Sequence, residues 1–99
     1  MNIVEQNKSS ISKLCRLHHV KNMYLFGSVL TEKFSSDSDV DFLVNFEQVD
    51  LFQYFNNYME FKEKLEQLFN RPVDLLEEQT VQNPILRRSI DRNKKLIYG

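Results

Sequence analysis

Two aspartates separated by one residue, Asp39 and Asp41, open the segment DVDFLVNF and carry the clearest chemical signal in the sequence. On an extended strand, side chains two residues apart point to the same face, so both carboxylates would lie together. Like charges at that distance repel each other unless a cation lies between them. Magnesium prefers hard oxygen ligands and is commonly held by one or two carboxylates plus substrate phosphates. The pair predicts a divalent-metal site, with a solvated strand edge as the alternative.

A third aspartate, Asp74, interrupts the apolar run between Val73 and Leu76. If this run is a strand beside the one that carries Asp39 and Asp41, Asp74 can face the same metal pocket. Three such carboxylates would hold two divalent ions, one activating an attacking hydroxyl and the other neutralising a triphosphate. An exposed residue at a sheet edge is the alternative interpretation of Asp74.

The dipeptide Gly27-Ser28 follows the apolar run from Met23 to Phe26. A strand that turns directly into a helix exposes backbone N–H groups, which together with the helix dipole favour a phosphate. Glycine allows close approach of the backbone, and the serine hydroxyl adds a donor. The pattern indicates a phosphate cradle, although the isolated dipeptide is also common in ordinary strand-to-helix turns.

Other ion and phosphate motifs are excluded. The segment from Asp37 begins like a calcium loop, but Phe42 stands where an EF-hand needs glycine and Gln48 where it needs glutamate. A P-loop requires a second internal glycine followed by lysine, which the chain lacks. One cysteine and two adjacent histidines do not give the spacing of a zinc site.

The elements that must position these residues follow from hydrophobic periodicity. A first helix is predicted over 7–19, with Ser9 or Ser10 as N-cap, followed by a strand over 23–26 and a helical turn over 29–34. A loop over 35–38 leads to a strand over 40–46, whose alternation places Val40, Phe42 and Val44 on one face. A strand over 73–76 and a strand or tail over 95–98 complete the chain.

The longest helix is predicted over 50–69, and a last helix begins with Asn83 as N-cap and Pro84 as first residue. In the last helix, Leu86 and Ile90 are expected to be buried. The buried stripe of the long helix is predicted from its periodicity to comprise Phe52, Phe55, Met59, Leu65, Leu68 and Phe69. This order of elements predicts an α/β (α+β) fold, a small mixed sheet packed with helices.

The aromatic residues of the long helix cannot all lie on one narrow stripe, so some are expected to be exposed. They are Phe52, Tyr54, Phe55, Tyr58 and Phe61. Exposed aromatic clusters mark association surfaces, here for a homodimer or a partner protein, with core packing alone as the alternative. Arg87, Arg88 and Arg92 are either a solvated face or a basic rim for a nucleotide, an RNA end or an acidic partner.

The composition bounds the class of protein. Ninety-nine residues predict one domain, 1–99, and a net charge of −1 makes nucleic-acid binding unlikely. The single cysteine, Cys15, excludes an internal disulfide and is expected in the core. No signal peptide or membrane-spanning run is visible, so a cytoplasmic location without membrane contact is expected.

The combination of these motifs resembles the nucleotidyltransferase superfamily that includes DNA polymerase beta, and more narrowly its minimal, MNT-like members. The resemblance covers a leading helix, then YLFGS, SDSDVDFLV, RPVDLL and ILRRSIDRNKKLIYG in that order. It implies the polymerase beta palm-like fold. Many members carry arginines just after Gly-Ser, where this chain has Val29, Leu30 and Thr31, with Lys33 as the nearby cation.

The resemblance also implies roles for individual residues. Gly27, Ser28, Ser38 and Lys33 would bind the nucleotide. The metal and catalytic residues would be Asp39, Asp41 and Asp74, which would bind two magnesium ions, and Asp74 would help to deprotonate the acceptor hydroxyl.

The implied reaction transfers a nucleoside monophosphate, expected to be AMP from ATP, to a hydroxyl and releases pyrophosphate. Family members are often encoded beside a HEPN-domain toxin, whose tyrosine is the acceptor, and act as type VII-like antitoxins. Two alternatives stay open at this point: a non-catalytic antitoxin module that only binds its partner, and transfer to an RNA terminus.

Overall fold

A computed structural model describes residues 3–27 and 38–99. Within them, one mixed sheet contains β1 (Val20–Phe26), β2 (Val40–Phe46), β3 (Val73–Glu77) and β4 (Lys95–Tyr98) in the order β3-β2-β1-β4. Strand β1 pairs antiparallel with β2 and β4, whereas β2 and β3 are parallel. The predicted strands over 40–46 and 73–76 are confirmed. The predicted helical turn over 29–34 and loop residues 35–37 lie outside the described residues.

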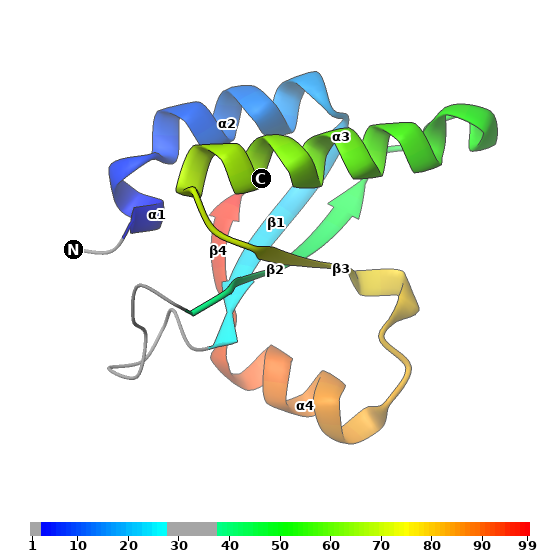
Figure 1. Cartoon of the computed structure of the whole chain (residues 1–99). Helices are drawn as coiled ribbons and strands as arrows, with labels where there is room; N and C mark the ends of the chain where they lie inside the picture. The colour runs from blue at the N-terminus through cyan, green and yellow to red at the C-terminus, as the bar shows by residue number, and fades with distance from the viewer. Residues whose placement is uncertain (1–2, 28–37) are drawn as a thin grey trace.

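The helices cover the sheet from two sides. They are α1 (Ile3–Gln6), α2 (Lys8–Leu17), α3 (Leu51–Phe69) and α4 (Pro84–Asn93), with a short 3₁₀ turn, η2 (Glu78–Thr80), after β3. In Figure 1, α2 and α3 lie on one face of the sheet and α4 lies on the other. In the described ranges, no helix combines the length and the apolar character needed to cross a bilayer.

The main core lies between the sheet and the α2–α3 layer. Val40, Phe42 and Val44 of β2 are completely buried there, as the alternating pattern predicted. They share this core with Phe61 and Leu65 of α3, also completely buried. The opposite face of β2 therefore remains for the residues at positions 39, 41, 43 and 45.

Helix α3 confirms the predicted range but only part of the predicted buried stripe, in which Leu65 and Phe69 are buried and Leu68 is partly buried. Its N-cap, Asp50, accepts a hydrogen bond from the Phe52 backbone N–H at 3.1 Å. The buried residues are Phe61, Leu65 and Phe69, whereas the side chains of Phe52, Phe55 and Met59 are 92%, 68% and 43% exposed. The prediction was wrong for these three residues because they lie on the side of α3 that faces away from the sheet. The sheet side of the same turns carries Tyr54 and Tyr58, whose rings contact Phe46 of β2.

Helix α2 carries Cys15 in the core as predicted, and burial raises the pKa of its thiol to about 12. The thiol is therefore protonated and unreactive at neutral pH. The predicted N-cap was wrong, because Ser9 and Ser10 lie inside α2 and Asn7 precedes it. The Asn7 amide donates instead to the Ile3 carbonyl of α1 at 2.7 Å.

Helix α4 begins as predicted, because the Asn83 side chain accepts hydrogen bonds from the backbone N–H groups of Ile85 and Leu86. Ile90 is buried, but Leu86 is 44% exposed, so the prediction of its burial was wrong. The helix is held to the sheet largely by polar contacts, which include an ion pair of 2.7 Å between Arg87 and Glu78. Lys94 adds a cation–π contact, 4.4 Å from the centroid of the Tyr24 ring.

The two halves of α3 should respond differently to truncation. Phe61→Ala should lower the free energy of unfolding by about 3–5 kcal/mol, because it opens a cavity in the closed core. Phe52→Ala should change it by less than about 0.5 kcal/mol, because that ring contacts mostly solvent. Urea denaturation of both variants measures the difference. Equal losses would contradict the assignment of buried and exposed halves.

Candidate active site

The parallel pairing of β2 and β3 brings two of the predicted site residues together. Asp41 and Asp74 are direct partners in the register. Neighbouring strands lie about 4.8 Å apart, and paired residues project from the same face of the sheet. Asp41 alternates with the core residues Val40 and Phe42, so both carboxylates lie on the face opposite the main core. Two carboxylates side by side at the sheet surface are the chemical centre of the site.

Gly27 follows β1, on the other side of β2 from β3, and packs against the Asp41 carboxylate of this pair. Its φ of +81° is in the left-handed region, which favours glycine. A Cβ atom at this position would lie 2.1 Å from Oδ2 of Asp41, an impossible contact. The register agrees, because Phe26 is the partner of Asp41 across β1 and β2. The backbone at Gly27 can therefore approach whatever the Asp41 carboxylate binds, as the phosphate-cradle interpretation requires.

Asp39 lies at the entrance to β2 and is exposed. Both of its neighbours are tied to the turn before β3. The Ser38 carbonyl accepts a hydrogen bond from Arg71 Nη1 at 3.2 Å, and the Val40 N–H donates to the Pro72 carbonyl at 3.2 Å. These contacts fix the backbone that carries Asp39. No role was predicted for Arg71 from the sequence. Its position three residues before Asp74 was the one feature that could have pointed to a role near the site.

The carboxylates fit magnesium chemistry as a pair. Among residues 3–27 and 38–99, no group of three or more His, Cys, Asp or Glu side chains is arranged to hold a metal ion. The predicted trio is therefore not gathered into a closed cage in this structure. Magnesium typically takes one or two carboxylates and completes its shell with water and substrate phosphates. Asp41 and Asp74 offer that donor set, and Gly27 leaves room beside it.

Side chains of α3 contact β3, the edge strand that carries Asp74. The pKa of Tyr58 is raised, first by burial and second by the Asp74 carboxylate. The Tyr58 hydroxyl donates to the Leu75 carbonyl, and Glu66 accepts a hydrogen bond from the Val73 N–H at 3.1 Å. Side chains of α3 thus form hydrogen bonds with backbone groups of β3 that are not paired with β2. A strand from another molecule would have to displace them in order to pair here.

The structure says little about the other residues predicted to bind the nucleotide. Ser28 and Lys33 lie outside the described residues, so their assignment stays a prediction. Of the three arginines considered as a basic rim, Arg87 forms ion pairs with Glu78 and Asp91 and has a structural role. Arg88 and Arg92 are exposed.

Comparison with known proteins identifies the family. Residues 9–99 match the family model described as polymerase beta, nucleotidyltransferase. A Methanocaldococcus jannaschii relative, named "Putative protein adenylyltransferase MJ1379", is 32% identical over 98 residues, which cover 91% of this chain and 95% of the relative. The chain therefore belongs to the polymerase beta nucleotidyltransferase family.

Solved structures agree with this assignment. A structure described as that of a minimal nucleotidyltransferase has a TM-score of 0.77 and 28% identity, covering 96% of this chain and 95% of its own. A toxin–antitoxin structure with AMP-PNP has a TM-score of 0.72 and 25% identity, covering 94% of this chain and 73% of its own. The resemblance seen in the sequence is confirmed, and the chain is a nucleotidyltransferase with the polymerase beta-like fold.

Replacement of Gly27 tests the contact with Asp41. Gly27→Ala should cost about 1–2 kcal/mol of stability for the positive φ. It should also slow nucleotidyl transfer by about 100-fold, because a displacement of about 1 Å at a catalytic group can cost that much. Urea denaturation and transfer from labelled ATP measure the two effects.

Gly99→Ala is the matched control for this variant. Gly99 also has a positive φ, of +109°, but it lies beside Asn22 at the end of β4. We expect this variant to keep the wild-type transfer rate. An unchanged rate in Gly27→Ala would show that the glycine does not serve the Asp41 site.

Proposed function

We propose that this nucleotidyltransferase transfers AMP from ATP, with magnesium, to a tyrosine hydroxyl of a HEPN-type toxin and thereby acts as its antitoxin. The observation that carries the proposal is the pairing of Asp41 with Asp74 against the backbone of Gly27. Two like charges side by side on the sheet surface repel each other, and a cation with bound phosphates would neutralise them.

Each residue has a separate role in this proposal. Asp41 and Asp74, with Asp39 at the entrance of β2, would hold two magnesium ions, which supply Lewis-acid stabilisation of the phosphates and lower the pKa of the attacking hydroxyl. Asp74 accepts the proton of that hydroxyl. The acceptor oxygen forms a bond to the α-phosphorus, the bond from that phosphorus to the bridging oxygen breaks, and pyrophosphate leaves. Gly27 and Ser28 contact the phosphates.

The comparisons support the nucleotide and the setting. The M. jannaschii relative is named as a protein adenylyltransferase, and the toxin–antitoxin structure was solved with AMP-PNP. Both descriptions concern other proteins. They favour ATP over other triphosphates and a protein acceptor over an RNA terminus for this chain.

The partner is proposed to dock on the side of the first turns of α3 that faces away from the sheet. Four large apolar side chains are exposed there, those of Leu51, Phe52, Phe55 and Met59. Tyr54, Phe55 and Tyr58 also line a hollow of about 320 Å³ with Leu76 of β3. This surface adjoins β3, the edge strand that carries Asp74. A toxin that docks there and reaches around this edge can present a hydroxyl to the carboxylates on the other face of the sheet.

The catalytic proposal is tested by carboxamide variants. Asp41→Asn and Asp74→Asn should each reduce transfer of label from α-³²P ATP to the co-purified toxin by about 100-fold or more, because the loss of metal stabilisation is worth several kcal/mol. Removal of magnesium with EDTA should abolish transfer in the wild-type protein. Labelled toxin resolved by electrophoresis is the measurement.

Asp50→Asn provides the matched control for these variants. Asp50 caps α3 and lies in neither of the strands that carry the acidic pair, and asparagine caps a helix as well as aspartate. It should retain full transfer. If the Asp41→Asn protein neutralises the toxin as well as wild type and neither labels it, the protein acts by binding alone.

The docking surface is tested by polar substitution of two exposed rings. Phe52→Ser together with Phe55→Ser should weaken toxin binding at least about tenfold, because truncation of interface aromatics commonly costs 2 kcal/mol or more. Binding of ATP should stay unchanged. Calorimetry with each ligand measures both, and sedimentation of the chain alone shows whether this surface instead forms a homodimer. Full toxin affinity in the double variant would place the partner elsewhere.

A further inference from the structure

A hollow of about 550 Å³ opens beside Gly27 and plays no part in the site as described so far. It lies between the end of β1 and helix α4. Its lining includes Phe26, Gly27, Leu86, Ser89, Ile90 and Asn93. Gly27 therefore belongs both to the wall of this hollow and to the contact with the Asp41 carboxylate.

The hollow and the carboxylates lie on the same side of the sheet. Phe26 is the register partner of Asp41, and paired residues of neighbouring strands project from the same face. Helix α4 covers this face (Figure 1). A ligand with its phosphates at Asp41 and Asp74 can therefore extend past Gly27 into the hollow without crossing the sheet.

The walls of the hollow differ in chemistry. Phe26, Leu86 and Ile90 supply an aromatic ring and two branched apolar side chains, which suit the faces of a planar aromatic ring. Ser89 and Asn93 add a hydroxyl and a carboxamide on α4. An apolar slot with a few polar groups at one side is the usual form of a small-molecule site.

The carboxamide of Asn93 is oriented by its own helix. Its Nδ2 donates to the Ser89 carbonyl at 3.0 Å, which uses one of the two amide hydrogens. The second hydrogen and the Oδ1 acceptor remain for a ligand. A carboxamide pairs with adenine by accepting from the exocyclic amine and donating to a ring nitrogen. Guanine has a carbonyl in place of that amine. Its oxygen would face Oδ1 of Asn93, and two acceptors repel each other.

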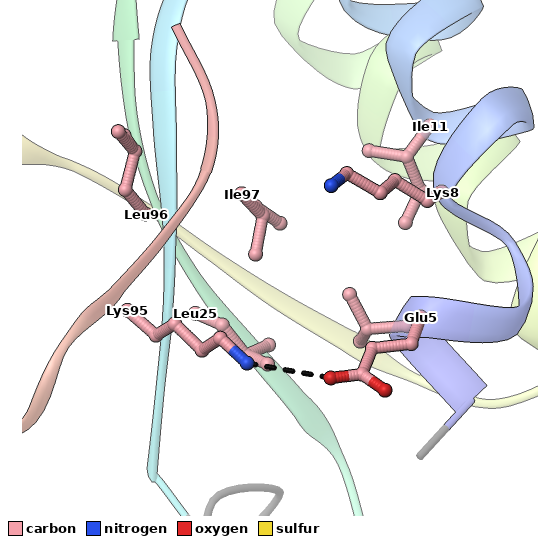
Figure 2. A pocket seen from close by; sticks show the side chains of 8 residues that line it. Glu5, Lys8, Ile11, Leu25, Lys95, Leu96 and Ile97 are labelled. Atoms are coloured by element: carbon pink, nitrogen blue, oxygen red, sulfur yellow. Dashed lines mark hydrogen bonds and ion pairs between the residues drawn. The ribbon is translucent and has the colours of Figure 1, made fainter. Parts of the chain in front are cut away.

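Lys95 adds no positive charge to the hollow beside Gly27, although it is part of the lining. Lys95 follows α4 and lines the hollow, but its ammonium is directed to the other face of the sheet. Figure 2 shows that face, where Lys95 and Glu5 form an ion pair of 3.3 Å at a separate hollow of about 310 Å³. The hollow beside Gly27 thus suits an uncharged group rather than a further phosphate.

From these observations we propose that the hollow between Phe26 and α4 binds the base of the nucleotide and that Asn93 selects adenine. The proposal rests on the function proposed above, because it assumes that the triphosphate binds at Asp41 and Asp74. The walls are held in place before binding, since Ile90 is buried and Arg87 anchors α4 to Glu78 at 2.7 Å. The acceptor tyrosine ring is the competing occupant.

The experiment compares the affinities of ATP, GTP and inorganic triphosphate, each with magnesium, by calorimetry. The wild-type protein should bind ATP about tenfold more tightly than GTP, since a bidentate contact is worth about 1–3 kcal/mol of discrimination. Asn93→Leu, which keeps the size of the side chain, should reduce this preference to about onefold. Ser89→Phe, which fills the hollow, should weaken ATP at least about tenfold. Triphosphate should bind equally well to all these proteins.

Arg92→Leu is the control, because Arg92 is exposed on the same helix and does not line the hollow. It should keep both the affinity for ATP and the preference over GTP. Unchanged ATP binding in Ser89→Phe, with normal triphosphate binding, would overturn the base assignment and leave the proposed function intact. Unchanged ATP binding with a raised KM for the toxin would assign the hollow to the acceptor. Absence of any triphosphate binding in the wild-type protein would overturn both proposals.

Discussion

The parallel register of β2 and β3 is the constraint on which the proposed active site depends. It places Asp41 directly beside Asp74, so two like charges are held together on neighbouring strands. Their repulsion is opposed by the apolar residues that alternate with them, because Val40, Phe42 and Leu75 are almost fully buried under α2 and α3. Since the side chains of a strand alternate, a shift of the register by one residue would expose this core. Core packing therefore enforces a close pair of carboxylates.

The two faces of the sheet have different roles, one in the core and one at the acidic pair. The α2–α3 face carries the main core, including Cys15 and Phe61, both fully buried. The α4 face carries the acidic pair and Gly27, and the contacts of α4 there include the ion pair of Arg87 with Glu78 and one buried residue of the helix, Ile90. A thin and largely polar attachment leaves space between α4 and the sheet, which a fully apolar layer would fill. The hollow beside the carboxylates follows from this difference in packing.

Helix α3 is both a core element and a surface element. Its second half packs against the sheet through Leu65 and Phe69, and the outer side of its first half exposes the rings of Phe52 and Phe55. Tyr58 lies between these halves, and its hydroxyl binds the outward carbonyl of Leu75 on β3. The same helix thus supports the core, closes the edge strand that bears Asp74 and exposes an apolar surface next to the site.

The family, the order of the elements and the acidic residues could be predicted from the sequence, because strand alternation, Asn83-Pro84 and the ordered motifs around Gly27 are local signals. Which residues meet depends on contacts between segments that are distant in the chain. The pairing of Asp41 with Asp74 needs a strand register, and the exposure of Phe52 depends on which side of α3 faces the sheet. Periodicity marks the apolar face of a helix but does not show how much of it another layer covers. The same reason explains why Arg71 and the hollow beside Gly27 appeared only in three dimensions, since both join segments far apart along the chain.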